Sequence, residues 1–428
     1  MTDLVRGTPR LVRAINDRAA LHLLLRQGPL TRPEISKLTG LSKPTVSQVL
    51  ARLEVAGLVV TNGLRTGLPG RVPETYRIAP TSAYVAAVDV TPEWIAVRTA
   101  DITGTVLGET EVPTPNTQEP GVLLGALRTA LAGLPTPEPP RRVVIGVQGA
   151  VDPTTGRIEY ASEEDMAGWL IPDVERVLSE GLGLQAVVEN DVNLAAVAEQ
   201  AHAASGCPDF VLLWADEGLG AALVIDGRLH RGFFGGAGEV GYLPLPGAAT
   251  ARDAGHYGRH GYQELAGGDA VLDLLHSYGV PGTDFPDAVV EAVRLATESS
   301  GRAAEAAEAG LRVVAARLAT GLASIVTVLD PGLVVLAGRL STAGGEHLRA
   351  LVARELRVLS HSRARIRLSA VEGNPVLSGA LELALTAARE EVFGATVPAA
   401  REGWAAGGRP SGAGAGGEGG GGGGAGAG

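Results

Sequence analysis

The chain of 428 residues is long enough for two or three domains, and 45% hydrophobic with 19% charged residues is typical of a soluble globular protein. A single cysteine, Cys207, excludes a disulfide framework and a multi-cysteine metal site. Arginines are scattered through the first 18 residues, where a signal peptide needs an apolar core, and the longest apolar stretch is broken by Asp330 and Pro331. We therefore expect a cytoplasmic protein without a membrane span.

The net charge of -11 is unevenly distributed along the chain. Residues 1–80 carry 12 Lys or Arg and 5 Asp or Glu, a net charge of +7, and the remainder carries -18. A basic segment joined to an acidic body indicates a nucleic-acid-binding module fused to a different unit. At the other end, 14 of the 22 residues 407–428 are glycine and none is aromatic, so residues 396–428 are expected to be a disordered tail.

The basic segment has the pattern of a winged helix-turn-helix. Apolar residues at helical spacing predict a first helix with Leu11, Ile15, Ala19, Leu23 and Leu24 on its inner face. A second, short helix is predicted from the capping box of Thr31 and Glu34, and Gly40 ends it in a left-handed turn. A third helix is capped by Ser42 and has an apolar stripe of Val46, Val49, Leu50 and Leu53. Strands near 58–61 and 74–78 then enclose an arginine-containing wing.

The third helix is the expected recognition helix for DNA. Short polar side chains lie opposite its apolar stripe, and such a face suits entry into the major groove. The expected DNA contacts on this helix and the wing are Lys43, Thr45, Ser47, Gln48, Arg52, Arg65 and Arg71. Arg52 is expected to contact a phosphate, because phosphate contacts predominate in such complexes. Ser47 and Gln48 are equally compatible with ordinary solvent-facing positions.

From Thr81 onward, near-continuous apolar strands alternate with Ala-rich helices, which indicates covered α/β sheets. Four segments occur in order: VVIGVQGAVDPTTGRI, VVENDVNLAAVAE, LVIDGRLHRGFFGGAGEVGY and VVLAGRLS. With the winged helix in front, these segments resemble the signature segments of the ROK family of repressors, open reading frames and kinases, over residues 10–395. The resemblance implies a DNA-binding domain of residues 1–80 and an actin-like, two-lobed sugar-kinase fold around a sugar cleft in residues 81–395.

The resemblance also shows where this chain departs from the family's kinases. Their first phosphate loop, Asp-x-Gly-x-Thr, matches residues 89–93, where Thr91, Pro92 and Glu93 stand. Their second, Gly-Thr-Gly-x-Gly, matches residues 216–220, where Asp216 and Glu217 replace glycine and threonine. Glycine turns bring backbone N–H groups to phosphates, and carboxylates without a compensating cation repel polyphosphate. We expect no catalytic residue and no enzymatic activity, although Asp191 matches the family's catalytic base.

Zinc is also expected to be absent. The family's structural zinc site uses one histidine and three cysteines, and the matching positions here are Tyr242, Gly255, Tyr257 and Tyr262. None of these is an ordinary zinc ligand, so we expect no metal and no cofactor, with tyrosine packing in place of the metal. His256 and His260 leave an improvised metal site as the lesser alternative.

The sugar-binding positions of the family are better matched. The resemblance implies sugar contacts from Gly149, Asn190, Asp191, Glu239 and Glu264, since carboxylates and amides can hold adjacent hydroxyls. Alternatively, these residues pair only with one another. We interpret the chain as a sugar-responsive transcriptional regulator, a repressor released from operator DNA by a sugar or sugar derivative, acting as a homodimer or homotetramer. The alternatives are a dimerisation or protein-docking scaffold without a sugar effector and, less favoured, a sugar kinase.

Overall fold

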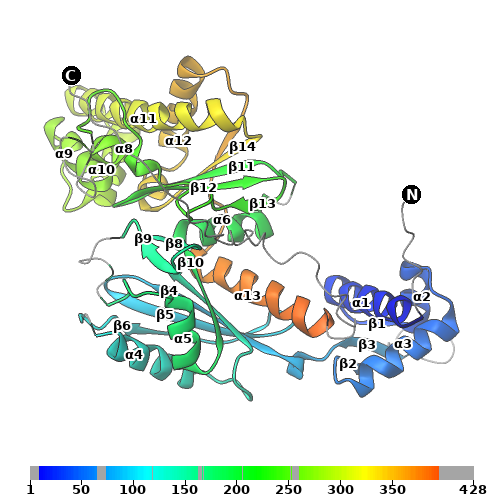
Figure 1. Cartoon of the computed structure of the whole chain (residues 1–428). Helices are drawn as coiled ribbons and strands as arrows, with labels where there is room; N and C mark the ends of the chain where they lie inside the picture. The colour runs from blue at the N-terminus through cyan, green and yellow to red at the C-terminus, as the bar shows by residue number, and fades with distance from the viewer. Residues whose placement is uncertain are drawn as a thin grey trace, which may run out of the picture.

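A computed structural model describes residues 9–64, 74–117, 119–161, 166, 168–204, 206–250, 252 and 260–394 of the chain. The described chain forms a helical head and two α/β lobes, and the head lies beside the first lobe (Figure 1). The glycine-rich tail of residues 396–428 lies outside the described residues.

The head contains the predicted three helices and a small antiparallel sheet. The helices are α1 (Pro9–Gln27), α2 (Arg32–Thr39) and α3 (Lys43–Val55). The strands β1 (Leu30–Thr31), β3 (Glu74–Ile78) and β2 (Val59–Leu64) pair in that order. The wing residues Arg65 and Arg71 lie outside the described residues, so their DNA contacts stay predictions.

The local signals that set these helices are confirmed. The Thr31 hydroxyl accepts a hydrogen bond from the Glu34 N–H, and the Glu34 carboxylate accepts one from the Thr31 N–H at 2.9 Å. Such a cap typically contributes about 1 kcal/mol. Gly40 ends α2 with φ of 70°, a conformation that costs glycine little. Ser42 caps α3 through the Thr45 N–H. The predicted apolar stripe of α3 is fully buried.

The buried face of α1 differs from the predicted one. Ile15 is 55% exposed and Ala19 is also exposed, whereas Leu21 and Asp17 are buried. Apolar periodicity could not identify this face because it includes a carboxylate. Asp17 is only 6% exposed and lies 2.5 Å from the guanidinium of Arg52 on α3, so an ion pair replaces an apolar contact there.

The first lobe is built on a five-stranded sheet with strand order β10-β7-β4-β5-β6. Three strands form an antiparallel meander, and the other two run parallel beside the first of them. The strands are β4 (Tyr84–Val90), β5 (Trp94–Asp101), β6 (Val106–Pro113), β7 (Arg142–Val147) and β10 (Gln185–Asn190). The lobe also includes helices α4 (Pro120–Ala132) and α5 (Val174–Leu182), the hairpin β8 (Ala150–Asp152) and β9 (Arg157–Glu159), and the short helix η1 (Pro80–Ser82).

The second lobe repeats this topology with strand order β13-β12-β11-β14-β15. The meander comes first in the chain again, and two parallel strands are again added beside its first strand. The strands are β11 (Phe210–Ala215), β12 (Leu219–Ile225), β13 (Arg228–His230), β14 (Leu333–Ala337) and β15 (Arg365–Leu368). The helices are η2 (Val240–Tyr242), α8 (Gly261–Ala266), α9 (Gly268–Ser277), α10 (Phe285–Glu298), α11 (Arg302–Leu329) and α12 (Arg339–Leu359).

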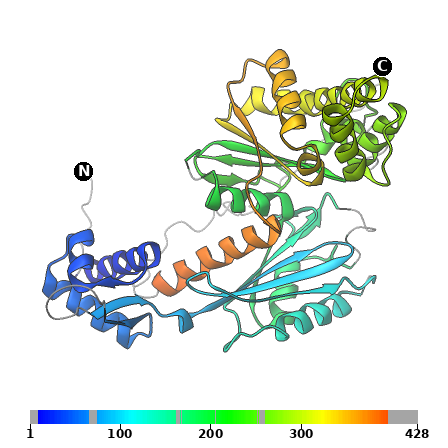
Figure 2. The same ribbon diagram turned by 180° about the vertical axis from the view of Figure 1, so that it is seen from behind.

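Two helices cross between the lobes. Helix α6 (Asp191–His202) follows the last strand of the first lobe and packs on the second-lobe strand β12, whereas α13 (Pro375–Gly394) follows the last strand of the second lobe and packs on β4 and β7 of the first. Both views show α13 extending from the junction of the lobes to α1 in the head (Figures 1 and 2). The two lobes are therefore connected by exchanged helices, and one of these helices also reaches the head.

Helix α11 is apolar over most of its length. Among the described residues it is the one helix long and apolar enough to cross a membrane by length and composition alone, and 50% of its most apolar window is buried. Its Leu311, Val314, Leu318 and Leu322 belong to the core of the second lobe. The apolar stretch that Asp330 and Pro331 interrupt begins in the last part of this helix.

Candidate functional sites in the head and at the lobe junction

The recognition helix presents most of its predicted DNA contacts to solvent. Lys43, Ser47 and Gln48 are exposed, and Thr45 is half-buried. The Ser47 hydroxyl donates to the Lys43 carbonyl oxygen, and the hydroxyl of Thr45 lies 2.8 Å from that of Ser42. These hydroxyls are thus engaged within the helix, whereas the Lys43 and Gln48 side chains make no hydrogen bond to any described residue.

Arg52 is held by a contact that the sequence did not reveal. Its guanidinium donates to both oxygens of Asp17, at 2.5 and 3.3 Å. This ion pair connects the recognition helix to α1, and its partners lie 35 residues apart in the sequence. The expected phosphate contact of Arg52 stays a prediction, but the residue also has a structural role, because removing it leaves the buried Asp17 carboxylate unpaired.

Three carboxyl groups and one amide meet where the lobes join. We call this group the junction site, and it consists of Asp89, Asn190, Asp191 and Glu239. Asp89 is in β4, Asp191 is the first residue of α6, and Glu239 precedes η2 in the second lobe. The pKa of Asp191 is raised to about 7, chiefly by burial and in addition by the charges of Asp89 and Glu239. Burial also raises the pKa of Glu239 to about 7 and that of Asp89 to about 6. Near neutral pH these carboxyls can both donate and accept hydrogen bonds.

The predicted sugar residues Gly149, Asn190 and Asp191 form one hydrogen-bonded group. The Asn190 amide donates to the Gly149 carbonyl oxygen at 3.1 Å and to the Asp191 carboxylate at 3.0 Å. The carbonyl oxygen of the same amide caps α6 by accepting from the Asn193 N–H. The fold therefore fixes the orientation of Asn190 before any ligand binds.

Glu239 differs from its neighbours in the hydrogen bonding of its carboxylate. Within the described residues, no group donates a hydrogen bond to it, although protein surrounds most of its side chain. Asp89, in contrast, accepts a bond of 2.7 Å from the Asn374 amide. A partly buried carboxylate without a donor is costly unless it is protonated or a ligand supplies the donor.

Glu264 does not join this group in the structure. It is exposed on α8, and its carboxylate accepts a 2.5 Å hydrogen bond from the Ala249 N–H. The carboxylates that affect the pKa of Asp191 are those of Asp89 and Glu239. The sugar contact of Glu264 stays a prediction. Asp89 is a member of the junction site that the sequence assigned only to the first phosphate loop.

The tyrosines at the expected zinc positions make packing contacts. Tyr262 is fully buried, and its hydroxyl donates to the Leu318 carbonyl oxygen at 2.8 Å. The ring of Tyr242 lies 5.3 Å from that of His260 and 6.1 Å from that of Tyr160. In the described part of the chain, no three His, Cys, Asp or Glu side chains are grouped as metal ligands. Gly255, His256 and Tyr257 lie outside the described residues, so the absence of metal stays a prediction.

Comparisons with known proteins settle the family. The profile of the ROK family matches residues 85–387, and that of the MarR family matches residues 16–65. The chain belongs to the ROK family. It is 24% identical to the xylose repressor of Caldicellulosiruptor bescii over 89% of this chain and 98% of that protein.

Two solved ROK structures support the predicted fold. The structure of a ROK family transcriptional regulator, a homologue of the E. coli MLC protein, has a TM-score of 0.68 at 18% identity and covers 90% of this chain and 99% of its own. The ROK hexokinase from Thermus thermophilus has a TM-score of 0.58 at 27% identity and covers 72% of this chain and 99% of its own. The α/β fold with two lobes and a winged head is confirmed, and ROK kinases share the two lobes.

In the segment that matches the second ROK phosphate loop, residues 216–220, the two carboxylates form ion pairs with an arginine of the same chain. Arg339, the first residue of α12, donates to Asp216 at 2.8 Å and to Glu217 at 2.9 Å. Its backbone N–H donates to the other oxygen of Asp216. The sequence showed the two carboxylates but not the cation that pairs with them, because Arg339 lies more than 120 residues away in sequence. The carboxylate of Asp216 occupies the helix N-terminus that could otherwise bind an anion.

The segment that matches the first phosphate loop, residues 89–93, ends in a tight turn held by hydrogen bonds. The Thr91 hydroxyl bonds with the N–H and carbonyl groups of Trp94 at 3.1 Å, and the Thr114 hydroxyl donates to the Thr91 carbonyl oxygen. The backbone N–H groups of Thr91 and Trp94 are therefore already bonded within the protein.

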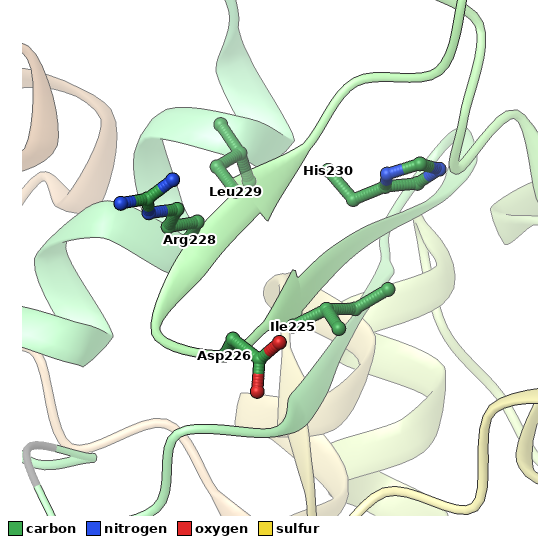
Figure 3. Close-up of a pocket in the computed structure, with 5 residues that line it drawn as sticks. All are labelled: Ile225, Asp226, Arg228, Leu229 and His230. Carbon is green, nitrogen blue, oxygen red and sulfur yellow. The ribbon is translucent and has the colours of Figure 1, made fainter. Parts of the chain in front are cut away.

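A surface hollow of about 500 Å³ lies away from these residues, at the β12–β13 hairpin (Figure 3). It is lined by Ile225, Asp226, Arg228, Leu229 and His230. All five come from a single hairpin, and Figure 3 shows the Arg228 and His230 side chains pointing away from each other. Because its polar groups do not converge, we assign it no ligand.

The raised pKa of Asp191 predicts a specific dependence of stability on pH. A carboxyl whose folded pKa is raised contributes stability below its unfolded pKa, and this contribution is lost as the pH rises through the folded value of about 7. Asp191→Asn should remove that loss. At pH 8 the variant should melt above the wild type by about 2–4 °C, the shift that 1 kcal/mol gives in a domain of 150–250 residues.

Differential scanning fluorimetry between pH 5 and pH 8 measures this effect. Asp273→Asn, at an exposed position of α9, is the matched control and should leave the pH profile unchanged. A difference between Asp191→Asn and the wild type that is equal at pH 5 and pH 8 would contradict the prediction.

Proposed function

We propose that this ROK protein is a sugar-responsive, DNA-binding transcriptional repressor without phosphoryl-transfer activity. In this proposal residues 1–80 bind operator DNA, and residues 81–395 bind a sugar or sugar derivative and mediate a homodimer or homotetramer in the cytoplasm. The observation that carries the proposal is the difference between the junction site and the segment that matches the second phosphate loop. In the junction site, no described residue donates a hydrogen bond to the Glu239 carboxylate. In the segment that matches the second phosphate loop, Asp216 already binds Arg339.

The head supports the DNA-binding part of the proposal. Its net charge of +7 supplies the attraction to phosphates, and α3 exposes Lys43 and Gln48 next to hydroxyl-bearing residues. The similarity to the xylose repressor extends over 89% of this chain and thus includes both the head and the lobes. A symmetric dimer would present two such helices to a pseudo-palindromic operator.

Helix α13 is the structural basis that we propose for communication between the two sites. At its start, the Asn374 side chain accepts from the Leu377 N–H and donates to Asp89 in the junction site. At its end, Phe393 packs edge-on against His22 of α1, with ring centroids 5.8 Å apart. One helix of 20 residues, about 30 Å long, therefore contacts the ligand site and the head. A ligand that shifts Asp89 can thus reposition the head.

The DNA-binding prediction separates phosphate from base contacts. Lys43→Ala should weaken binding to every DNA sequence and lower the slope of log affinity against log salt by about 1. Gln48→Ala should instead alter the preference at one position per half-site, by about 1–3 kcal/mol. Fluorescence anisotropy with an operator selected from random DNA, at several KCl concentrations, measures both effects.

Arg302→Ala, which removes an exposed arginine of the second lobe, is the charge-matched control and should bind DNA like the wild type. Arg52→Ala is a poor probe because it also breaks the ion pair to Asp17. DNA binding that is equally strong in Lys43→Ala and the wild type at all salt concentrations would contradict the assigned recognition face.

The sugar response is tested first with a ligand screen and then with one variant in the junction site and one in α13. In the screen, a panel of pentoses, hexoses, amino sugars and their phosphates is tested for release of the protein from its operator. The active sugar should change DNA affinity by about 5–150-fold, the range of typical allosteric coupling. Glu239→Gln should weaken sugar binding, measured by calorimetry, because an amide accepts hydroxyl donors less strongly than a carboxylate.

Phe393→Leu should behave differently from Glu239→Gln. It removes the aromatic ring that packs on His22 but keeps an apolar side chain at this fully buried position, so sugar binding and sugar-free DNA binding should persist while the response of DNA affinity to sugar falls. Loss of all DNA binding in this variant would contradict the proposed role of α13. If no sugar in the panel binds or alters DNA affinity, the lobes act as a scaffold without a sugar effector.

The closed phosphate segments predict that Mg-ATP is not a substrate. Because Asp216 and Glu217 already hold Arg339, an ATP phosphate would have to displace an ion pair and then face two carboxylates. A coupled kinase assay with hexoses and hexosamines should show no turnover. Turnover that disappears in Asp191→Asn would refute this part of the proposal.

A further inference from the structure

The loop of residues 231–238 reaches from the second lobe to the first. Arg231 of this loop forms a 2.6 Å ion pair with Glu189, the residue directly before Asn190 of the junction site. Gly235 lies so close to the Val151 carbonyl oxygen that a Cβ would overlap it, and a Cβ on Gly236 would lie 2.7 Å from the Tyr160 hydroxyl. Two points of the loop are thus fixed against the first lobe, next to the junction site.

Between these two points the loop carries a pair of exposed aromatic residues. Phe233 is 75% exposed and Phe234 is 58% exposed. Their rings meet edge to face with centroids 4.8 Å apart, so each ring holds the other in place. Adjacent exposed phenylalanines on a short, anchored loop are unfavourable in water, which indicates a binding role.

The size of the pair indicates which ligand it takes. A phenylalanine side chain buries about 150–250 Å² when covered, so the two rings expose roughly 200–330 Å² together. A stable protein partner covers about 800 Å² on each side, several times this area. A single pyranose or furanose ring offers a C–H face of about the size of one aromatic ring. The aromatic pair therefore fits one sugar ring better than a protein surface.

We propose that Phe233 and Phe234 form an outer subsite for the second ring of a disaccharide whose first ring occupies the junction site. This inference rests on the proposed function, because it requires a sugar at Asp191 and Glu239. The hydroxyls of the first ring bind the polar groups of the junction site, and the C–H face of the next group stacks on the aromatic pair.

The test compares ligands that differ by one ring. Isothermal titration calorimetry measures the dissociation constants of xylose and xylobiose, glucose and cellobiose, and N-acetylglucosamine and diacetylchitobiose. In at least one pair, the disaccharide should bind the wild type about five- to tenfold more tightly than the monosaccharide. Phe233→Ala combined with Phe234→Ala should abolish that difference and leave the monosaccharide affinity unchanged.

Two further variants sharpen the result. Phe233→Tyr combined with Phe234→Tyr keeps the ring faces and should retain the preference for the disaccharide. Val358→Ala, at a position of α12 that is 78% exposed, is the control for removing an exposed apolar side chain and should behave like the wild type. DNA binding without sugar should be the same in all variants, which shows that each is folded.

The outcomes that overturn the inference are distinct from failure of the proposed function. If monosaccharides bind but no disaccharide binds more tightly, or if the preference survives the double alanine variant, the outer subsite is absent while the junction site stands. If the double alanine variant changes the sedimentation coefficient instead, the pair belongs to an interface between copies of the chain. If no sugar binds the wild type, both proposals fail.

Discussion

The crossing of α6 and α13 is the contact on which the rest of the structure depends. Gly379 of α13 lies against the backbone of Leu194 in α6 so closely that a Cβ would overlap the Leu194 carbonyl oxygen. The buried Glu199 of α6 adds a polar connection, because its carboxylate accepts bonds from Arg367, Ser369 and the Ala370 N–H, just before α13 begins. Such a satisfied carboxylate fixes one geometry more strictly than apolar packing alone.

The same crossing brings the functional groups together. Asp191 is the first residue of α6, and Asn374 directly precedes α13, so both helices begin at the junction site. Helix N-termini stabilise negative charge, which partly offsets the repulsion among Asp89, Asp191 and Glu239. Burial nevertheless raises the pKa of each of these carboxyls. In the proposed function, a sugar at the junction site supplies the hydroxyl donors that this group of carboxyls lacks and contacts groups from both lobes at once.

The sequence predicted what depends on local patterns and on family motifs. The caps at Thr31 and Ser42 and the apolar face of α3 follow from short-range chemistry, and the ROK motifs indicated the two lobes. The sequence could not reveal pairs that only the folded chain brings together. Asp17 with Arg52, Asp216 with Arg339 and Asp89 with Asn374 are separated by 35, 123 and 285 residues. In each pair, the partner of a charged or polar residue cannot be found from the pattern of the neighbouring sequence.

The two kinds of ion pair in the lobes suggest how a sugar-kinase fold can serve as a sensor. The Arg339 pairs lie entirely within the second lobe, where they connect the turn after β11 to α12. A segment that is closed in this way does not depend on a nucleotide for its shape. Two of the contacts that span the lobes, Arg231 with Glu189 and Asn374 with Asp89, border the junction site. In the proposed function, a ligand at the junction site acts on these two contacts, and α13 extends from the contact of Asn374 with Asp89 to the head.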